Sequence, residues 1–256
     1  MLRVEVLGFA GAAPLQGGCS SYLVSDANTT VLLDCGPGTL ERLWRRGLVG
    51  ELDAIVISHM HADHVLDLML YAGEVVRELI GDRRIALFVP AVAGRDVLGR
   101  LDAVFAREAA TSTRFDATFA ISEYGASSRL AVGALELTFA ATEHAQPCFA
   151  ARVSDGESVI VYGADGNPSP ALVSLAHGAD LVILEATFLD DDAGAARHGH
   201  MTVAQAGAVA AQAGAARLLL THTLAGALDG ELVERASRSF GGPVEVAREG
   251  YVYPVS

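Results

Sequence analysis

The 256-residue sequence contains no lysine, because all 18 of its basic residues are arginine. This absence excludes chemistry that needs a lysine amine, including Schiff-base enzymes, pyridoxal enzymes and phosphate loops of the Walker type. Positive charge is scarce altogether, since 31 acidic residues give a formal net charge of -13. General binders of nucleic acid or anionic membranes need a basic face, so the overall balance argues against both partners.

Cysteine and long apolar runs are also scarce. The three cysteines, Cys19, Cys35 and Cys148, form no CxxC pair and are too few for a disulfide framework, which indicates a reducing cytoplasm. The N-terminal stretch carries Arg3 and Glu5 and lacks the basic head of a signal peptide. No uninterrupted apolar run reaches the ~18 residues of a membrane span. We therefore expect a cytoplasmic protein that does not associate with membranes.

Apolar residues are abundant, at 51% of the chain, which is enough for a large core and excludes a disordered chain. No linker rich in proline, glycine or serine divides the sequence, so we expect one domain over residues 1–256.

The apolar pattern predicts an α/β architecture. Short β-branched runs predict strands, for example over 53–58 and 116–122, and helical periodicity predicts helices, for example over 65–80 and 202–213. A β-rich stretch followed by alternating helices and strands occurs twice along the chain. This order favours a four-layer αββα sandwich, with two packed mixed β-sheets and helices outside.

A cluster of histidines follows the predicted strand over 53–58. His59, His61, Asp63 and His64 lie within six residues, and imidazole and carboxylate groups are the usual nitrogen and oxygen ligands of zinc. Two residues apart in an extended turn, His59 and His61 point the same way. Asp63 and His64 then lie at the corner between strand and helix, where they can face a second metal. A loop of solvated histidines is the simple alternative.

The H-x-H-x-D-H pattern after a hydrophobic strand resembles the signature of the metallo-β-lactamase superfamily of binuclear metallohydrolases. Further motifs of that family occur in order over essentially the whole chain. Asp34 lies in LLDCGPG, His144 in ATEHAQP, Asp165 in VYGADG and His222 in LLLTHTL.

The resemblance implies two metal ions, expected to be Zn²⁺, although these ligands also suit Mn²⁺ or iron. One ion would be held by His59, His61 and His144, and the other by Asp63, His64 and His222. Asp165 would bridge the two ions together with a water molecule. The resemblance also implies that Asp34 orients a ligand imidazole through its free ring N–H. The alternative for Asp34 is a turn residue before the Gly-Pro-Gly sequence.

Two segments are similar to motifs of the tRNA 3′-processing endonucleases of that superfamily. The segment 184–187, LEAT, is similar to their HEAT motif, and the segment 200–202, HMT, is similar to their H-S-T motif. This likeness implies that Glu185 pairs with His200, which would protonate the leaving oxygen as a general acid. On this likeness we assign Glu185 and His200 to catalysis. We also assign a catalytic role to Asp63 of the histidine motif. The alternatives are a charged strand end for Glu185 and a helix cap for His200.

The sequence departs from those endonucleases in ways that bear on the substrate. Leu184 replaces the first residue of HEAT and Met201 the serine of H-S-T, and only 21 positions separate His144 from Asp165, which leaves no room for their tRNA-binding arm. tRNA is therefore an unlikely substrate. The chain also looks like small phosphodiesterases of this fold, including atypical cyclic-nucleotide phosphodiesterases.

We accordingly favour a phosphodiesterase with a small-molecule substrate such as a cyclic nucleotide, and a homodimer is possible. The alternatives are an acyl hydrolase acting on a lactone, thioester or β-lactam, a tRNA 3′-processing endonuclease, and a metal-binding accessory protein without catalysis. Arg114, Tyr124 and Arg129 are candidates for gripping the leaving group. The acidic run over 190–192 is expected to be a solvated loop.

Overall fold

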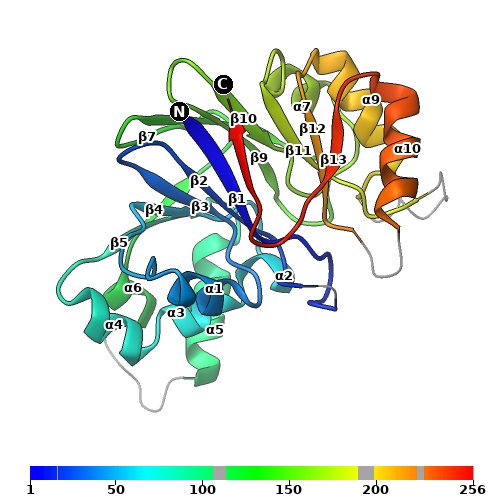
Figure 1. Ribbon diagram of the computed structural model, residues 1–256. Coiled ribbons are helices and arrows are strands. Elements are labelled where there is room, and N and C mark those ends of the chain that lie inside the picture. Colours follow the sequence, from blue (N-terminus) through cyan, green and yellow to red (C-terminus); the bar gives the residue numbers. More distant parts are fainter. Residues whose placement is uncertain (16, 106–113, 190–198, 224–227, 256) are drawn as a thin grey trace.

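The computed structural model describes residues 1–15, 17–105, 114–189, 199–223 and 228–255. Two seven-stranded sheets lie at the centre, with helices on their outer sides (Figure 1). This arrangement confirms the predicted four-layer αββα sandwich.

The first sheet is built mostly from the N-terminal half. Its order is β14 (Val252–Val255), β1 (Leu2–Gly8), β2 (Ser21–Ser25), β3 (Thr30–Leu33), β4 (Ala54–Val56), β5 (Ile85–Pro90) and β6 (Phe119–Tyr124). The strands β3 to β6 run parallel to one another. The last strand of the chain, β14, pairs antiparallel with β1, so the two ends of the chain lie side by side (Figure 1).

The second sheet comes from the C-terminal half. Its order is β13 (Val244–Val246), β12 (Leu218–Thr221), β11 (Leu181–Glu185), β10 (Val159–Tyr162), β9 (Phe149–Ser154), β8 (Leu135–Ala141) and β7 (Arg129–Val132). The strands β10 to β13 are parallel. Parallel strands end at a common edge of their sheet, and this edge is where the candidate site is found.

The helices form the two outer layers. The first sheet is covered by α1 (Thr39–Arg45), α2 (Ala62–Val65), α3 (Asp67–Tyr71), α4 (Glu74–Ile80), α5 (Gly94–Phe105) and α6 (Arg114–Thr118) (Figure 1). The second is covered by α7 (Pro170–Leu175), α9 (Val203–Ala213) and α10 (Asp229–Phe240).

Strands near the centre of each sheet, such as β2 and β11, are buried along their whole length because the other sheet covers one face and helices cover the other. In β2, Tyr22 and Val24 enter the core between the sheets, whereas Leu23 packs under the helices of the first sheet. In β11, Ile183 enters the central core and Leu184 packs under the second helical layer. Near-continuous apolar strands therefore follow from the four layers.

Two predicted elements are wrong in their extent. The single helix expected over 65–80 is divided between α2, α3 and α4. Gly73 separates α3 from α4, because it adopts an extended conformation (φ -74°, ψ 162°). The strand expected over 116–122 begins only at Phe119, because the residues before it form α6. Amphipathic spacing continues across such breaks, so the sequence pattern alone does not reveal them.

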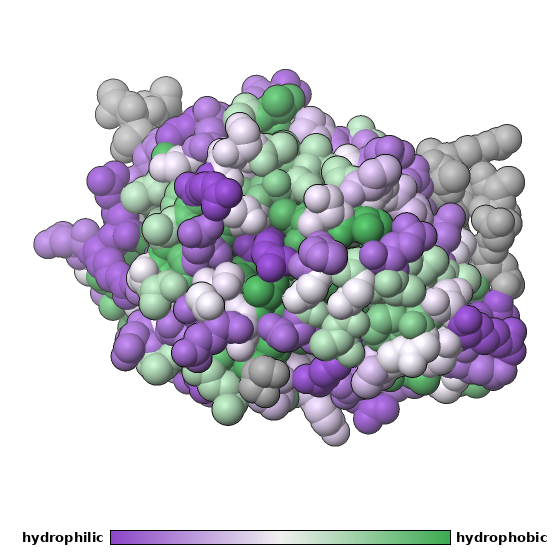
Figure 2. Space-filling model, turned by 90° about the horizontal axis from the view of Figure 1, so that it is seen from above, coloured by the Kyte–Doolittle hydropathy of each residue, from purple (hydrophilic) through white to green (hydrophobic). Residues whose placement is uncertain are grey.

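The surface seen from the upper side of Figure 1 mixes hydrophilic and hydrophobic residues (Figure 2). Within the described ranges, no helix is both long and apolar enough to span a bilayer.

The start of α9 carries a capping box, which lies just after the candidate residue His200. The Thr202 hydroxyl accepts a hydrogen bond from the Gln205 backbone N–H at 3.2 Å, and the Thr202 N–H donates to the Gln205 side chain at 2.8 Å. We predict that Thr202→Ala lowers the free energy of unfolding by about 1 kcal/mol, because one N–H of the first turn loses its partner. Urea denaturation measures this change, and a stability equal to that of the wild type would contradict it.

Candidate metal centre

The candidate site lies where strands of both sheets end. Asp34 directly follows β3, His59 lies three residues after β4, Asp165 lies three residues after β10, and His222 directly follows β12. His144 comes from the loop between β8 and β9. The structure brings all the residues that the sequence analysis assigned to the two metals into one cluster.

Asp34 is fully buried and accepts four hydrogen bonds. Its Oδ1 accepts from the Ser58 backbone N–H at 2.7 Å, and its Oδ2 accepts from the Ser58 hydroxyl at 2.8 Å and the Tyr162 hydroxyl at 2.7 Å. The fourth donor is Nδ1 of His64, at 2.7 Å from Oδ2. A buried carboxylate saturated in this way is more than a turn residue, and it fixes the orientation of His64.

The inner nitrogen of His64 faces a carboxylate oxygen without a hydrogen bond. Because Nδ1 donates to Asp34, Nε2 is the atom that carries the lone pair when the ring is neutral. This atom lies 3.5 Å from Oδ1 of Asp165, and both atoms are buried without a hydrogen-bond partner. Unsatisfied buried polar atoms are rare in native proteins, and two that face each other across this distance are suited to a cation between them.

The first group of ligand atoms contains three histidine nitrogens and one carboxylate oxygen. Nδ1 of His61 lies 2.9 Å from Nε2 of His59 and 3.0 Å from Nε2 of His144. His144 donates from its Nδ1 to the main-chain carbonyl of Gly199 at 2.7 Å, so its Nε2 carries the lone pair of the neutral ring. Oδ2 of Asp165 lies 3.7 Å from Nε2 of His59 and completes this group.

The second group consists of Asp63, His64 and His222. Nε2 of His222 lies 3.2 Å from Oδ2 of Asp63 and 3.3 Å from Oδ2 of Asp165. The backbone N–H of Ala12 donates to the same oxygen of Asp63 at 2.8 Å, which holds that carboxylate in place. Asp165 therefore contacts both groups, as a bridging ligand must.

The charged groups of the cluster shift one another's pKa values. Burial alone would lower the pKa of His64 and His222, but Asp165, together with Asp34 beside His64 and Asp63 beside His222, raises both. Burial alone would raise the pKa of Asp165, but His222 and His64 hold it well below its usual range. Ionised carboxylates therefore lie among the inner nitrogens. With oxygen and imidazole donors of this kind, the residues present fit divalent metal ions.

His200 lies against this cluster and pairs with Glu185. Its Nδ1 lies 3.0 Å from Oε2 and 3.2 Å from Oε1 of Glu185, which is the contact expected from the sequence. Burial alone would lower the pKa of His200, but the hydrogen bond and the charge of Glu185 raise it. The His200 ring stacks on that of His222 with centroids 5.5 Å apart and is 17% exposed, so a small molecule can reach it. Thr202, not His200, caps the following helix.

Strained backbone gathers around the site. Among the described residues, five that are not glycine have a positive φ, and four of them lie in or next to the cluster: Ala12, Asp34, Ala164 and His222. Such conformations cost of order 1–3 kcal/mol each and persist where the surroundings enforce them, most often at functional sites. This clustering supports a functional centre here on grounds separate from the ligand chemistry.

Sequence reasoning missed three supporting hydroxyls. Ser58 and Tyr162 donate to Asp34, and Thr187 contacts both Glu185 and His222. Ser58 directly precedes the histidine motif and Thr187 lies in LEAT, so both were adjacent to residues already assigned. Their role depends on which side chains meet in space, which spacing along the chain does not give.

The three residues that were candidates for binding the leaving group make other contacts. The Tyr124 hydroxyl is buried and donates to the carbonyl of Ile57, and Arg129 pairs with Glu136 at 2.7 Å on the surface. Arg114 pairs with Asp102 at 3.2 Å. The acidic run over 190–192 lies outside the described residues.

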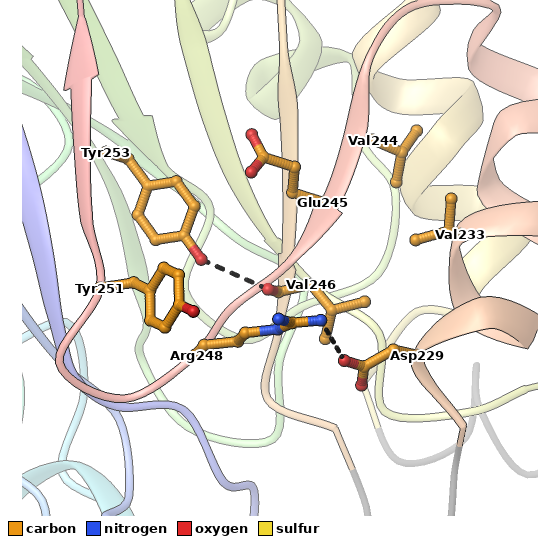
Figure 3. A pocket seen from close by; sticks show the side chains of 8 residues that line it. All are labelled: Asp229, Val233, Val244, Glu245, Val246, Arg248, Tyr251 and Tyr253. Atoms are coloured by element: carbon orange, nitrogen blue, oxygen red, sulfur yellow. Dashed lines mark hydrogen bonds and ion pairs between the residues drawn. The ribbon is translucent and has the colours of Figure 1, made fainter.

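A separate hollow opens between the edge strands β13 and β14 (Figure 3). It has a volume of about 260 Å³ and includes Arg248, Tyr251 and Tyr253. The guanidinium of Arg248 pairs with Asp229 at 3.1 Å and lies over the Tyr251 ring, so its charge is already matched. None of the cluster residues lines this hollow.

Comparison with known families identifies the chain. Residues 29–223 match the model of the Beta-lactamase superfamily domain. The chain belongs to the beta-lactamase superfamily. Its sequence and its cluster of ligand atoms place it among the metallo-hydrolases of that superfamily.

Two relatives are similar to this metallo-hydrolase over nearly its whole length. It is 31% identical to the probable metallo-hydrolase YhfI of Bacillus subtilis, over 98% of this chain and 99% of the relative. The crystal structure of YhfI superposes with a TM-score of 0.85 at 27% identity, covering 98% of both chains. Ribonuclease Z of Haloarcula marismortui is 29% identical over 97% of this chain and 95% of the relative.

Asp165 contacts both groups of ligand atoms, so its replacement tests the bridging arrangement of this metallo-hydrolase. We predict that Asp165→Asn weakens metal binding at both positions by more than the ~10–100-fold typical of a lost supporting hydrogen bond. Metal analysis after gel filtration measures the content per chain. Asp96→Asn, which changes an exposed surface pair with Arg100, is the matched control. Full retention of both metals by Asp165→Asn would rule out the bridging role.

Proposed function

We propose that this metallo-hydrolase cleaves a small phosphodiester, such as a cyclic nucleotide, with two divalent metal ions, expected to be Zn²⁺. The observation that carries the proposal is the pair of Glu185 and His200 beside the metal ligands, with Nδ1 of His200 3.0 Å from the carboxylate. A thioester hydrolase has less need of such a pair, because a thiolate leaves without a proton, whereas the alkoxide that leaves phosphorus requires one.

Each side chain of the site has a separate role in the proposed reaction. When bound, the metals supply a nucleophilic hydroxide at neutral pH and neutralise charge on the phosphoryl oxygens. His200 gives the proton on its Nε2 to the oxygen that leaves phosphorus as the P–O bond breaks. Glu185 holds the opposite nitrogen, Nδ1, and favours the protonated ring, which is the form that an acid requires. Asp63 and Asp165 serve as metal ligands.

The charge distribution favours a small anion over tRNA. The chain has a net charge of -13, and several arginines outside the site are paired with carboxylates, for example Arg217 with Glu245 at 2.8 Å and Arg129 with Glu136 at 2.7 Å. A polyanion binds by covering a continuous basic surface, which such pairing does not offer. A small phosphodiester needs only the local positive charge of the metals and His200.

Comparison with ribonuclease Z supports a phosphodiester as the class of substrate but argues against tRNA as the substrate of this chain. The match with the Haloarcula marismortui enzyme extends over 301 aligned positions although this chain has 256 residues, so the relative has segments without a counterpart here. Between His144 and Asp165, where a tRNA-binding arm was considered, this chain has only β9, β10 and short turns.

The function is tested by offering the metal-loaded protein 3′,5′-cyclic nucleotides, a linear dinucleotide, a tRNA precursor, a lactone and nitrocefin. We expect turnover of the cyclic or linear diesters. Turnover of the lactone or nitrocefin alone would instead establish an acyl hydrolase, and turnover of the precursor alone a tRNA endonuclease. No turnover by protein that retains its metals would favour an accessory role.

We predict that His200→Ala lowers kcat on a cyclic nucleotide by ~10²–10⁴-fold, the usual contribution of a general acid. The loss should be much smaller on bis(p-nitrophenyl) phosphate, because p-nitrophenolate leaves without a proton. Metal content should stay at the wild-type value. Loss of metal would instead make His200 a ligand, as its place in a third possible ligand group with Asp165 and His222 allows.

The exposed His177 provides the matched control. It lies after α7, away from the ligand cluster, and its backbone carbonyl accepts from Arg152. His177→Ala removes the same imidazole and should leave both rates unchanged. An equal loss on both substrates in His200→Ala would contradict the role of proton donor.

A further inference from the structure

Two hydroxyl groups connect buried carboxylates to imidazoles of the cluster. The first is Ser58, which is 4% exposed and directly precedes His59. Its Oγ lies 2.8 Å from Oδ2 of Asp34 and 3.1 Å from Nδ1 of His59. The same Asp34 oxygen also accepts directly from Nδ1 of His64 at 2.7 Å. One carboxylate therefore engages one imidazole directly and a second through a hydroxyl.

Thr187 makes the same arrangement in the second sheet. It is 8% exposed, and its Oγ1 donates to Oε2 of Glu185 and lies 2.9 Å from Nδ1 of His222. Glu185 also pairs directly with Nδ1 of His200. Glu185 thus corresponds to Asp34, Thr187 to Ser58 and His222 to His59, although these residues come from unrelated segments of the chain.

The number of available protons determines which atom donates in each of these hydrogen bonds. A hydroxyl has one proton, and an ionised carboxylate can only accept. The proton of Ser58 therefore goes to Asp34, and Nδ1 of His59 must be the donor in the remaining contact. The Thr187 proton goes to the Glu185 carboxylate, which is a stronger acceptor than the His222 carbonyl at 3.2 Å or a neutral imidazole nitrogen, and this leaves Nδ1 of His222 as the donor.

The consequence is a defined tautomer for one histidine in each ligand group. With its proton on Nδ1, His59 presents the lone pair of Nε2 to the group of His61 and His144, and His222 presents its Nε2 to Asp63 and His64. We infer that Ser58 and Thr187 are positioning residues, whose hydroxyls connect Asp34 and Glu185 to one metal-binding imidazole of each group.

Other buried hydroxyls near the site differ from these two. Thr221 directly precedes His222, but its Oγ1 bonds to the Tyr22 hydroxyl, and Thr142 donates to the main-chain carbonyl of Asp165 at 2.6 Å. Neither has a hydrogen bond to an imidazole among the described contacts. The two bridges are therefore specific features and not a general consequence of burying serine and threonine.

Removal of each hydroxyl should weaken a different metal position. We expect Thr187→Val, which keeps the shape of threonine, to weaken metal binding at the position of Asp63, His64 and His222 by ~10–100-fold. Ser58→Ala should weaken the position of His59, His61 and His144 by a similar factor. Thr187→Ser should restore binding to within about threefold of the wild type, because it keeps the hydroxyl and loses only a methyl group.

The measurement uses protein labelled with ¹⁵N-histidine, titrated with Zn²⁺ against a competing chelator. Correlation spectra of the ring nitrogens report which histidines bind metal and which nitrogen carries the proton. Thr221→Val is the matched control: it makes the same change at a buried residue beside His222 and should leave both metal affinities unchanged. Circular dichroism of every variant verifies that the fold is intact.

Two results would overturn the inference. One is Thr187→Val and Ser58→Ala binding both metals as the wild type does. The other is a spectrum in which Nδ1 of His59 or His222 is unprotonated. The inference rests on the metal-binding part of the proposed function and not on the substrate. A protein that binds metal but cleaves no phosphodiester contradicts only the proposed function. If the wild type binds no Zn²⁺, the tautomers of the metal-free protein still decide the two bridges.

Discussion

The site depends on one constraint: a buried imidazole can offer a lone pair inward only if its outer N–H has a fixed acceptor. His64 has Asp34, and His144 has the carbonyl of Gly199. His59 and His222 reach carboxylates through hydroxyls. With the outer protons held in this way, the inner nitrogens of these four rings carry lone pairs whenever the rings are neutral. Such a set is unfavourable unless protons or metal cations occupy the space between them.

The acceptors are held by the ends of the strands, which explains why the site needs both sheets. Asp34 follows a parallel strand of the first sheet, and Glu185 ends a parallel strand of the second. Tyr162, at the end of β10, donates to Asp34 across the interface between the sheets. A shift of one sheet relative to the other would therefore disturb the support of the ligands on both. Close packing of the central core and ligand orientation are consequences of the same contacts.

Much of the fold and the ligand set could be predicted because their signals are local. A helix was expected over 202–213, and α9 occupies Val203–Ala213, because its apolar residues repeat at helical spacing within one short segment. His59, His61, Asp63 and His64 are close in the chain, so their convergence follows from a single turn. Gly73 gave no comparable signal, because apolar residues continue in helical spacing on both sides of it. The contact of Thr187 with His222 depends on the pairing of β11 with β12, which places Glu185 opposite Thr221.

The acidic composition and an anionic substrate are compatible because they act over different distances. Charges at the surface are screened beyond about 8–10 Å at physiological ionic strength, whereas a buried metal pair acts at contact distance. In the proposed function, a small phosphodiester would meet the divalent ions and His200, whose pKa Glu185 and Asp165 raise. A long polyanion must also lie along the outer surface, where the net charge of -13 repels it. The acidic composition therefore argues against an extended nucleic acid and is compatible with the small anion of the proposed function.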